Sequence, residues 1–213
     1  MKITKFGHCC LLIEEAGLRI LTDPGSFTTE QDSVKDIDLV LITHEHQDHF
    51  HVASVKKILA NNPHAEVITN STVGKLLDAE RINYRIIANA QHTNVKGVLI
   101  EGFGTTHAIV HPEIPVVENT GYFIAGKLFY PGDALTIPPK KVDCLALPTA
   151  GPWIKSSESI EYARAIKPRI CFPVHDAVVV PAMFGLMTYL AGTLLKPRGI
   201  LYHPLAPGET FDV

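Results

Sequence analysis

Charged residues are scarce in this chain, and no stretch of it concentrates lysine and arginine. They make up 19% of the 213 residues, and the net charge is -3. A nucleic-acid-binding surface normally shows a basic patch, so the composition gives a nucleic-acid partner no support. Hydrophobic residues reach 46%, which excludes a disordered chain and is enough for one large core. We therefore expect one globular domain over residues 1–213.

Cysteine spacings typical of a disulfide framework or a structural zinc site are also absent. The chain contains no Cys-x-x-Cys pair, and its cysteines are Cys9, Cys10, Cys144 and Cys171. This pattern predicts buried free thiols in a reducing compartment. The N-terminal residues are not followed by the apolar core of a signal peptide, so the expected location is the cytoplasm.

One long segment has no charge at all. It runs for 19 residues from Ala177 to Leu195, which meets the length criterion for a membrane span. Pro181, Gly185 and Gly192 interrupt it, and we therefore expect a helix over Pro181–Leu195 outside the membrane. Apolar residues encircle more than one face of this helix. The pattern predicts a homo-oligomer contact or an apolar wall for the substrate.

Strand-like and helix-like patterns alternate along the chain. Residues 3–23 are typical of two strands around a turn at 15–17, and Ile37–Thr43 is a short apolar run typical of a buried strand. We expect helices over 50–61, 71–77 and 157–166, and further strands over 66–69, 84–87, 97–102, 121–124, 127–130, 142–147, 169–174 and 199–202. The alternation predicts an α/β domain with helices covering the faces of its sheets.

Histidine is the residue in excess, with 11 copies, and it is the commonest metal ligand among side chains. Four potential ligands follow the 37–43 strand within six residues: His44, His46, Asp48 and His49. On a helix His44 and His46 would point about 200° apart, because each residue turns about 100°. In a loop they can converge. Four nitrogen and oxygen ligands this close are better shared between two ions than crowded on one.

Four more acidic or histidine side chains follow other expected strands: Asp23, His107, Asp133 and His175. Ligands at the C-terminal ends of several strands can meet along one edge of an α/β fold. Taken singly, His107 could be a buried structural histidine and Asp133 a turn residue. Taken together, their shared placement predicts one metal site.

These motifs resemble the metallo-β-lactamase-fold hydrolases. The resemblance is carried by the His-x-His-x-Asp-His run at 44–49, by His107, by Gly-Asp at 132–133 and by Pro-Val-His at 173–175. The segments 6–8, 21–24, 118–122 and 151–153 are similar to the branch that includes ascorbate-6-phosphate lactonase-like and other metal-dependent hydrolases. The resemblance covers about residues 3–176. It implies an αββα sandwich, in which two mixed sheets carry helices on their outer faces.

The resemblance also implies two divalent ions, zinc being expected and manganese or iron remaining open. The first ion would be bound by His44, His46 and His107. The second would be bound by Asp48, His49 and His175. Asp133 would bridge both, and Asp23 would orient a ligand from outside. The β-lactamases of the family usually place a cysteine where Asp133 stands, which counts against antibiotic hydrolysis.

The implied activity is hydrolysis of a small ester, lactone or phosphorylated molecule. Two ions about 3.5–4 Å apart lower the pKa of a water between them toward about 7, and the resulting hydroxide attacks the substrate. The catalytic carboxylates would be Asp133, Asp48 and Asp23. Three further residues could contact the substrate or orient a ligand, although a structural role is equally open for them: His8, Trp153 and Lys155.

Three other functions remain as alternatives. A phosphodiesterase or nuclease is weakened by the acidic balance of charge. A di-iron oxidoreductase of the same fold would be expected to need a flavin partner domain, for which 213 residues leave no room. A metal-binding protein without turnover is disfavoured by the complete ligand set.

Overall fold

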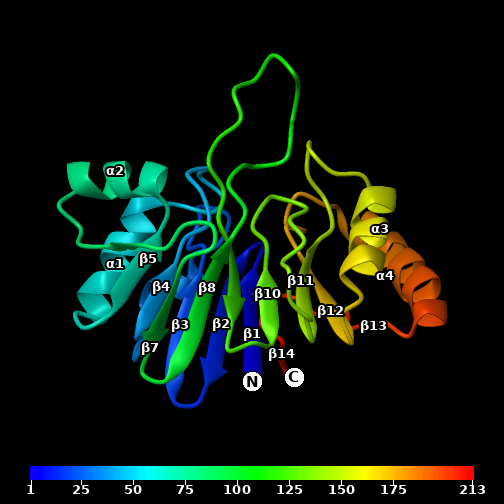
Figure 1. The fold of residues 1–213 in the computed structure, drawn as a ribbon, viewed down its shortest axis with the longest axis horizontal. Helices are drawn as coiled ribbons and strands as arrows, with labels where there is room; N and C mark the ends of the chain where they lie inside the picture. Colours follow the sequence, from blue (N-terminus) through cyan, green and yellow to red (C-terminus); the bar gives the residue numbers. More distant parts are fainter.

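Two sheets lie face to face in the centre of the computed structural model, which describes residues 1–213 (Figure 1). The order in the first sheet is β14 (Thr210–Asp212), β1 (Lys2–Gly7), β2 (Cys10–Glu15), β3 (Leu18–Thr22), β4 (Leu39–Leu41), β5 (Glu66–Thr69) and β6 (Arg85–Ile86). The order in the second is β13 (Leu201–Tyr202), β12 (Ile170–Val174), β11 (Cys144–Pro148), β10 (Leu128–Tyr130), β9 (Gly121–Ile124), β8 (Val98–Phe103) and β7 (His92–Val95).

Both sheets are mixed, and their parallel strands bring several strand ends to one edge. The strands from β3 to β6 run parallel, as do those from β10 to β13. The remaining neighbours are antiparallel, so β8 runs in the same direction as β10. The segments that follow β3 and β4 therefore leave the first sheet at one edge, and those that follow β8, β10 and β12 leave the second sheet together.

Helices cover the outer face of each sheet (Figure 1). The first sheet carries α1 (Val52–Asn61) and α2 (Ser71–Ala79), and the second carries α3 (Ser156–Ile166) and α4 (Pro181–Leu195). Two short 3-10 helices complete the chain, η1 (Glu30–Ser33) and η2 (Lys196–Arg198). The Asn70 side chain begins α2 by accepting a hydrogen bond from the Val73 amide. Pro181 stands at the start of α4, where its missing N–H costs nothing.

Buried apolar side chains fill three layers. The central layer lies between the sheets and joins residues such as Leu11 of β2 to Phe172 of β12. One outer layer packs α1 and α2 on the first sheet, and the other packs α3 and α4 on the second. The α/β class and the αββα sandwich are thus confirmed, and removal of these apolar faces from water is the main force that holds the layers together.

Several expected elements differ in detail. Residues 3–23 form three strands instead of two, because the chain reverses at Gly7-His8-Cys9 as well as at 15–17, and His8 takes a positive φ of 48° in that turn. The edge strands β7 and β14 were not expected, since β7 is mostly polar and both are short. Asn70 rather than Ser71 caps α2, and α3 begins at Ser156.

The helix expected over Pro181–Leu195 has these bounds in the structure. Ala191 and Leu195 are buried against the second sheet, whereas Leu186 and Tyr189 are exposed. The helix is therefore apolar all round but covered on one side only. None of the helices combines the length and the apolar character that a bilayer crossing requires.

Candidate metal centre

All seven predicted metal ligands converge at the strand ends between the two sheets. Their donor atoms fall into two groups, and within each group all atoms lie within 4.8 Å of one another. The first group consists of His44, His46, His107 and Asp133. The second consists of His8, Asp48, His49 and His175. The structure thus unites residues from the segments after β4, β8, β10 and β12 with His8 from the β1–β2 turn.

The Asp133 carboxylate lies between the two groups. Its Oδ2 atom is 3.3 Å from His107 Nε2 and 2.9 Å from His175 Nε2, and its Oδ1 atom is 3.1 Å from His49 Nε2. The carboxylate is buried. The carboxylate therefore contacts histidines of both groups, as a bridging ligand requires.

The turn that carries Asp133 admits no larger residue at Gly132. Gly132 has a positive φ of 64°, and a Cβ there would come within 2.4 Å of the Asn119 Oδ1 atom. Asn119 Oδ1 accepts a hydrogen bond from the Asp133 amide, while its Nδ2 donates to the Pro131 carbonyl. Asn119 thereby holds both sides of the turn and fixes where the carboxylate points.

Three histidines are locked in one orientation by acceptors behind them. Nδ1 of His44 faces Thr43 Oγ1 at 3.0 Å, Nδ1 of His49 faces Asp23 Oδ2 at 2.7 Å, and Nδ1 of His107 faces the Ala108 carbonyl at 2.5 Å. The Thr43 hydroxyl donates to Asp23, so its oxygen accepts from His44. With the Nδ1 proton used in this way, each ring directs Nε2 toward Asp133, and in the neutral form of the ring this nitrogen is free to bind a metal ion, which is the usual arrangement of metal-binding histidines.

Asp23 is the centre of this supporting network. Its Oδ2 atom accepts from His49 Nδ1, Thr43 Oγ1 and Tyr130 OH, and its Oδ1 atom accepts from the Thr43 amide, each at 2.7 Å. The side chain is fully buried, and the residue has a positive φ of 37°. Such a conformation is costly for a residue other than glycine and is typical of functional positions. Asp23 thus orients His49 without facing the site itself.

The buried donor atoms fit a cation. His49 Nε2 and Asp133 Oδ1 are both buried, and neither makes a hydrogen bond although they lie 3.1 Å apart. A buried polar atom without a partner costs about 1–3 kcal/mol. A positive ion shared by these atoms would remove that cost, and nitrogen and oxygen donors suit zinc, manganese or iron.

The two groups differ in their protonation. Burial and the nearby charge of His49 hold the pKa of His44 well below its usual range, and burial also lowers the pKa of His46. In the second group the charge of Asp133 outweighs burial. It raises the pKa of His49 well above the usual range and that of His175 to about 10. At neutral pH His44 and His46 therefore offer neutral imidazoles, whereas His49 and His175 hold protons that a metal ion has to displace.

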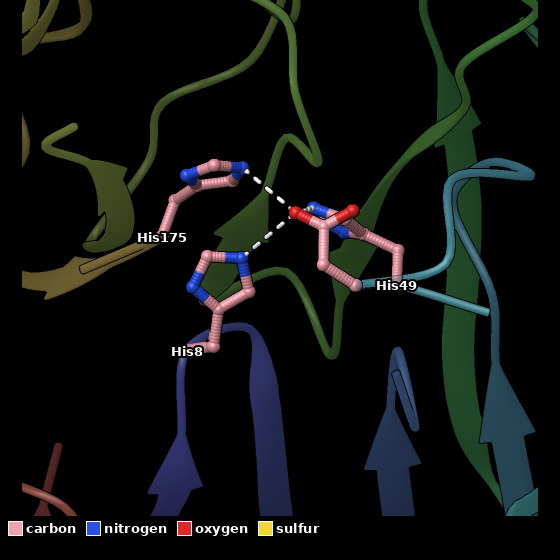
Figure 2. Close-up of side chains that lie close together, drawn as sticks. His8, His49 and His175 are labelled. Carbon is pink, nitrogen blue, oxygen red and sulfur yellow. Dashed lines mark hydrogen bonds and ion pairs between the residues drawn. The ribbon is translucent and has the colours of Figure 1, made fainter. Parts of the chain in front are cut away.

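His8 supports Asp48 from behind. The rings of His8, His49 and His175 lie close together, with His8 on the β1–β2 turn (Figure 2). The Ala177 amide donates to His8 Nδ1 at 3.3 Å, so the His8 proton is on Nε2, which donates to Asp48 Oδ2 at 3.0 Å. His8 therefore orients the Asp48 carboxylate.

Trp153 lines the cavity at the candidate metal centre, whereas Lys155 does not. A cavity of about 380 Å³ opens onto the site, and Trp153 lines it, with its ring 5.6 Å from that of His107 and 5.7 Å from that of His175. Lys155 is exposed, immediately precedes α3 and has its amide bonded to Glu158. It is not among the residues that line this cavity.

Several residues of the site were not found from the sequence: Phe27, Thr43, Asn119, Tyr130 and Val178. Thr43 directly precedes His44, and this position next to the histidine run is a signal from which a role in the site could have been predicted. Tyr130 and Asn119 act only through contacts with residues far along the chain. Phe27 and Val178 line the cavity and give no signal beyond being apolar.

Cys9 lies next to the second group of donor atoms. Its sulfur is within 4.8 Å of donor atoms of His49 and Asp133. Burial alone would raise the pKa of its thiol, but the positive charges of His49 and His8 lower it to about 6. The expectation of buried free thiols is confirmed for all four cysteines, and for Cys9 the thiol also borders the candidate metal centre.

A sandwich of two mixed sheets, with histidines and aspartates gathered at the ends of its strands, defines the class of metallo-β-lactamase-fold proteins. The model of the beta-lactamase superfamily domain matches residues 2–175. The chain belongs to this family of metallo-β-lactamase-fold hydrolases.

Sequence similarity to known proteins covers most of the chain. Protein Rv0786c of Mycobacterium tuberculosis is 37% identical over 191 residues, which cover 87% of this chain and 89% of that protein. A UPF0173 metal-dependent hydrolase of Aeropyrum pernix is 26% identical, with coverage of 86% and 85%. Igni18, a metallo hydrolase from the archaeon Ignicoccus hospitalis, has a similar structure, with a TM-score of 0.77, 19% identity and coverage of 100% and 98%. At that identity the likeness shows the fold alone.

Proposed function

We propose that this protein is a dinuclear metal-dependent hydrolase acting on a small, uncharged ester or lactone. The observation that carries the proposal is the orientation of His44, His49 and His107, whose Nδ1 atoms are tied to acceptors while Nε2 of each lies 3.1–3.9 Å from the Asp133 carboxylate. A histidine in a merely structural role has no need of this arrangement. Together with the buried Asp133 between two donor groups, this orientation supports a site for two ions.

The two groups of donor atoms indicate which residues would bind each ion. His44, His46 and His107 would hold one ion. Asp48, His49 and His175 would hold the other, with Asp133 contacting both. His8 and Asp23 contribute by orienting Asp48 and His49.

Metal ions bound here would lower the pKa of a water molecule and polarise the carbonyl under attack. The reaction adds that water across an acyl C–O bond, so that the products are a carboxylate, an alcohol and one proton. The chain's own residues position the reactants. Trp153, which is 8% exposed, walls the cavity beside His107 and His175, and Asp133 has a pKa held well below its usual range, so it stays ionised throughout.

The cavity walls favour an uncharged substrate over a phosphorylated one. The lining is formed by Phe27, His46, Gln47, Asp48, His107, Val110, Asp133, Pro152, Trp153, His175 and Val178, without any lysine or arginine. Phosphate recognition usually employs such cations. The same absence weakens a phosphodiesterase or nuclease, which would also need a basic path for the nucleic-acid backbone.

Metal analysis and a substrate panel test the proposal. Purified protein is expected to bind two ions per chain and to hydrolyse esters or lactones faster than phosphodiesters. His107→Gln should lose metal and activity together, whereas His64→Gln, at an exposed histidine outside the site, should lose neither. Two bound ions without turnover of any substrate in the panel would favour a metal-binding role, and preference for phosphodiesters would favour the nuclease alternative.

A further inference from the structure

A second cavity, of about 500 Å³, adjoins the metal cavity. It lies between the β1–β2 turn, the loop of residues 24–30 and the beginning of α4. Its apolar lining is provided by Phe6, Phe27, Val179, Pro181, Phe184 and Pro207. A volume of this size accommodates a substantial part of a small-molecule ligand.

The two cavities share a thin partition. Phe27 lines both of them, and of two consecutive residues Val178 lines the metal cavity while Val179 lines the second one. Phe27 is 51% exposed and Val178 is 52% exposed, so the partition consists of side chains that are not packed in the core. The His8 ring is 4.9 Å from the ring of Phe27, and its Nε2 is bonded to Asp48. A ligand seated in the second cavity therefore contacts His8, whose Nε2 is bonded to the candidate metal ligand Asp48.

The floor of this cavity carries no net charge. Asp176 is paired with Lys5, and the Lys5 ammonium also donates to the carbonyls of Pro173 and Leu205. Both side chains of the ion pair are buried, and every proton of the ammonium has an acceptor. The rim carries the Glu30 carboxylate. No lysine or arginine lines the cavity, so an anionic group is repelled and an uncharged apolar group is favoured.

We propose that this cavity binds the alkyl or acyl arm of an uncharged ester or lactone whose scissile carbonyl lies in the metal cavity. The inference rests on the proposed function, and it adds the substrate class. The first turn of α4 serves as an apolar wall for this arm through Pro181 and Phe184. Because burying one methylene contributes about 0.8 kcal/mol, each added methylene should raise kcat/KM about fourfold until the cavity is full.

The catalytic test compares aryl esters with acyl chains from acetyl to decanoyl in the metal-loaded protein. For the wild type, kcat/KM should rise with chain length and then level off. Phe184→Ala, which removes one wall, and Val179→Trp, which fills the space, should both reduce the ratio of octanoyl to acetyl kcat/KM by about tenfold or more. Leu76→Ala provides the matched control, because Leu76 is exposed on α2, which covers the other sheet, and does not line the cavity.

A binding measurement separates this inference from the proposed activity. Calorimetric titration of the metal-free protein should show that octanol binds more tightly than butanol, and that Phe184→Ala and Val179→Trp weaken octanol binding while Leu76→Ala does not. Phe184 belongs to none of the three buried core layers, so its truncation should leave the fold intact. Circular dichroism of each variant checks this.

The outcomes are distinguishable. The apolar subsite would be overturned if kcat/KM did not depend on acyl chain length. It would also be overturned if neither cavity substitution changed the affinity for octanol. Neither result would contradict the proposed hydrolase activity. Octanol binding that follows the substitutions, in a protein that hydrolyses no ester or lactone, would uphold the subsite and refute the proposed function.

Discussion

Replacing Asp23 with asparagine tests whether the network behind the metal ligands controls metal affinity. The substitution preserves the shape of the side chain and exchanges one carboxylate oxygen for an NH2 group. At present Oδ2 accepts three hydrogen bonds, from His49, Thr43 and Tyr130, while Oδ1 accepts one from the Thr43 amide. Whichever way the asparagine amide is turned, its NH2 group faces at least one donor.

The consequence for His49 follows from its tautomer. If the NH2 group faces the ring, His49 Nδ1 has to become the acceptor, and the ring proton moves to Nε2. A protonated Nε2 cannot bind a metal ion. Loss of such a supporting partner costs about 10–100-fold in metal affinity. A hydrogen bond to a charged group contributes about 1.5–3 kcal/mol, so the metal-free protein should also lose about 3 kcal/mol of stability. For a chain of this size that lowers Tm by about 6–12 °C.

The assay is competition for metal against a chromophoric chelator, followed by calorimetric melting of the metal-free protein. Asp38→Asn is the matched control, because Asp38 also accepts a backbone hydrogen bond, from Arg19, and pairs with Lys96, but is remote from the site. The control should keep the metal affinity of the wild type. If Asp23→Asn also kept that affinity and full activity, the reasoning from the His49 tautomer would be refuted.

Four shorter predictions follow from the site and from α4. Asp133→Ala should reduce metal content and turnover together, since one carboxylate faces both donor groups; full stoichiometry and turnover in that variant would exclude a bridging role. His8→Phe should weaken the second ion about 10–100-fold and leave the first unchanged, as equilibrium dialysis would show. The pKa of His175 is raised to about 10, so its paired, protonated form stabilises the metal-free protein fully below about pH 6.5, and this contribution is lost as the pH rises through about 10. Binding of the second ion should accordingly release protons and tighten with rising pH between about 6 and 9, measurable by calorimetry in buffers of different ionisation enthalpy. Sedimentation should show a homo-oligomer that Leu186→Lys dissociates, because this side of α4 is apolar and exposed; a monomeric wild type would contradict that expectation.

Much of the site could be predicted from the sequence because its ligands are marked locally. His44 to His49 follow a strongly apolar strand, and Asp133 and His175 each follow another within three residues. Parallel strands end at the same edge, so the periodicity that locates the strands also locates the ligands. The bounds of α4 were predictable for a similar reason, since Pro181 marks its beginning and the uncharged run marks its extent.

Other features depend on contacts between distant segments, which no local pattern records. The Tyr130 hydroxyl donates to Asp23, which is more than a hundred residues away in the sequence. Asn119 accepts from the Asp133 amide and so fixes the turn at Asp133. The role of His8 is decided by the Ala177 amide, which fixes its proton on the nitrogen that faces Asp48. Lys155, for which the sequence left a substrate contact and a surface position equally open, is exposed immediately before α3.

Composition and periodicity determined most of the residues that enter strands, helices and the apolar core of this protein, because the burial of apolar side chains follows the apolar pattern. The sequence by itself therefore determined the α/β class and the convergence of histidines and aspartates at strand ends. The tertiary structure alone decided which ring nitrogen His8, His44, His49 and His107 present and which apolar side chains enclose the second cavity. Those properties depend on the direction of individual side chains, and directions are set by partners that the fold brings together from far apart in the chain.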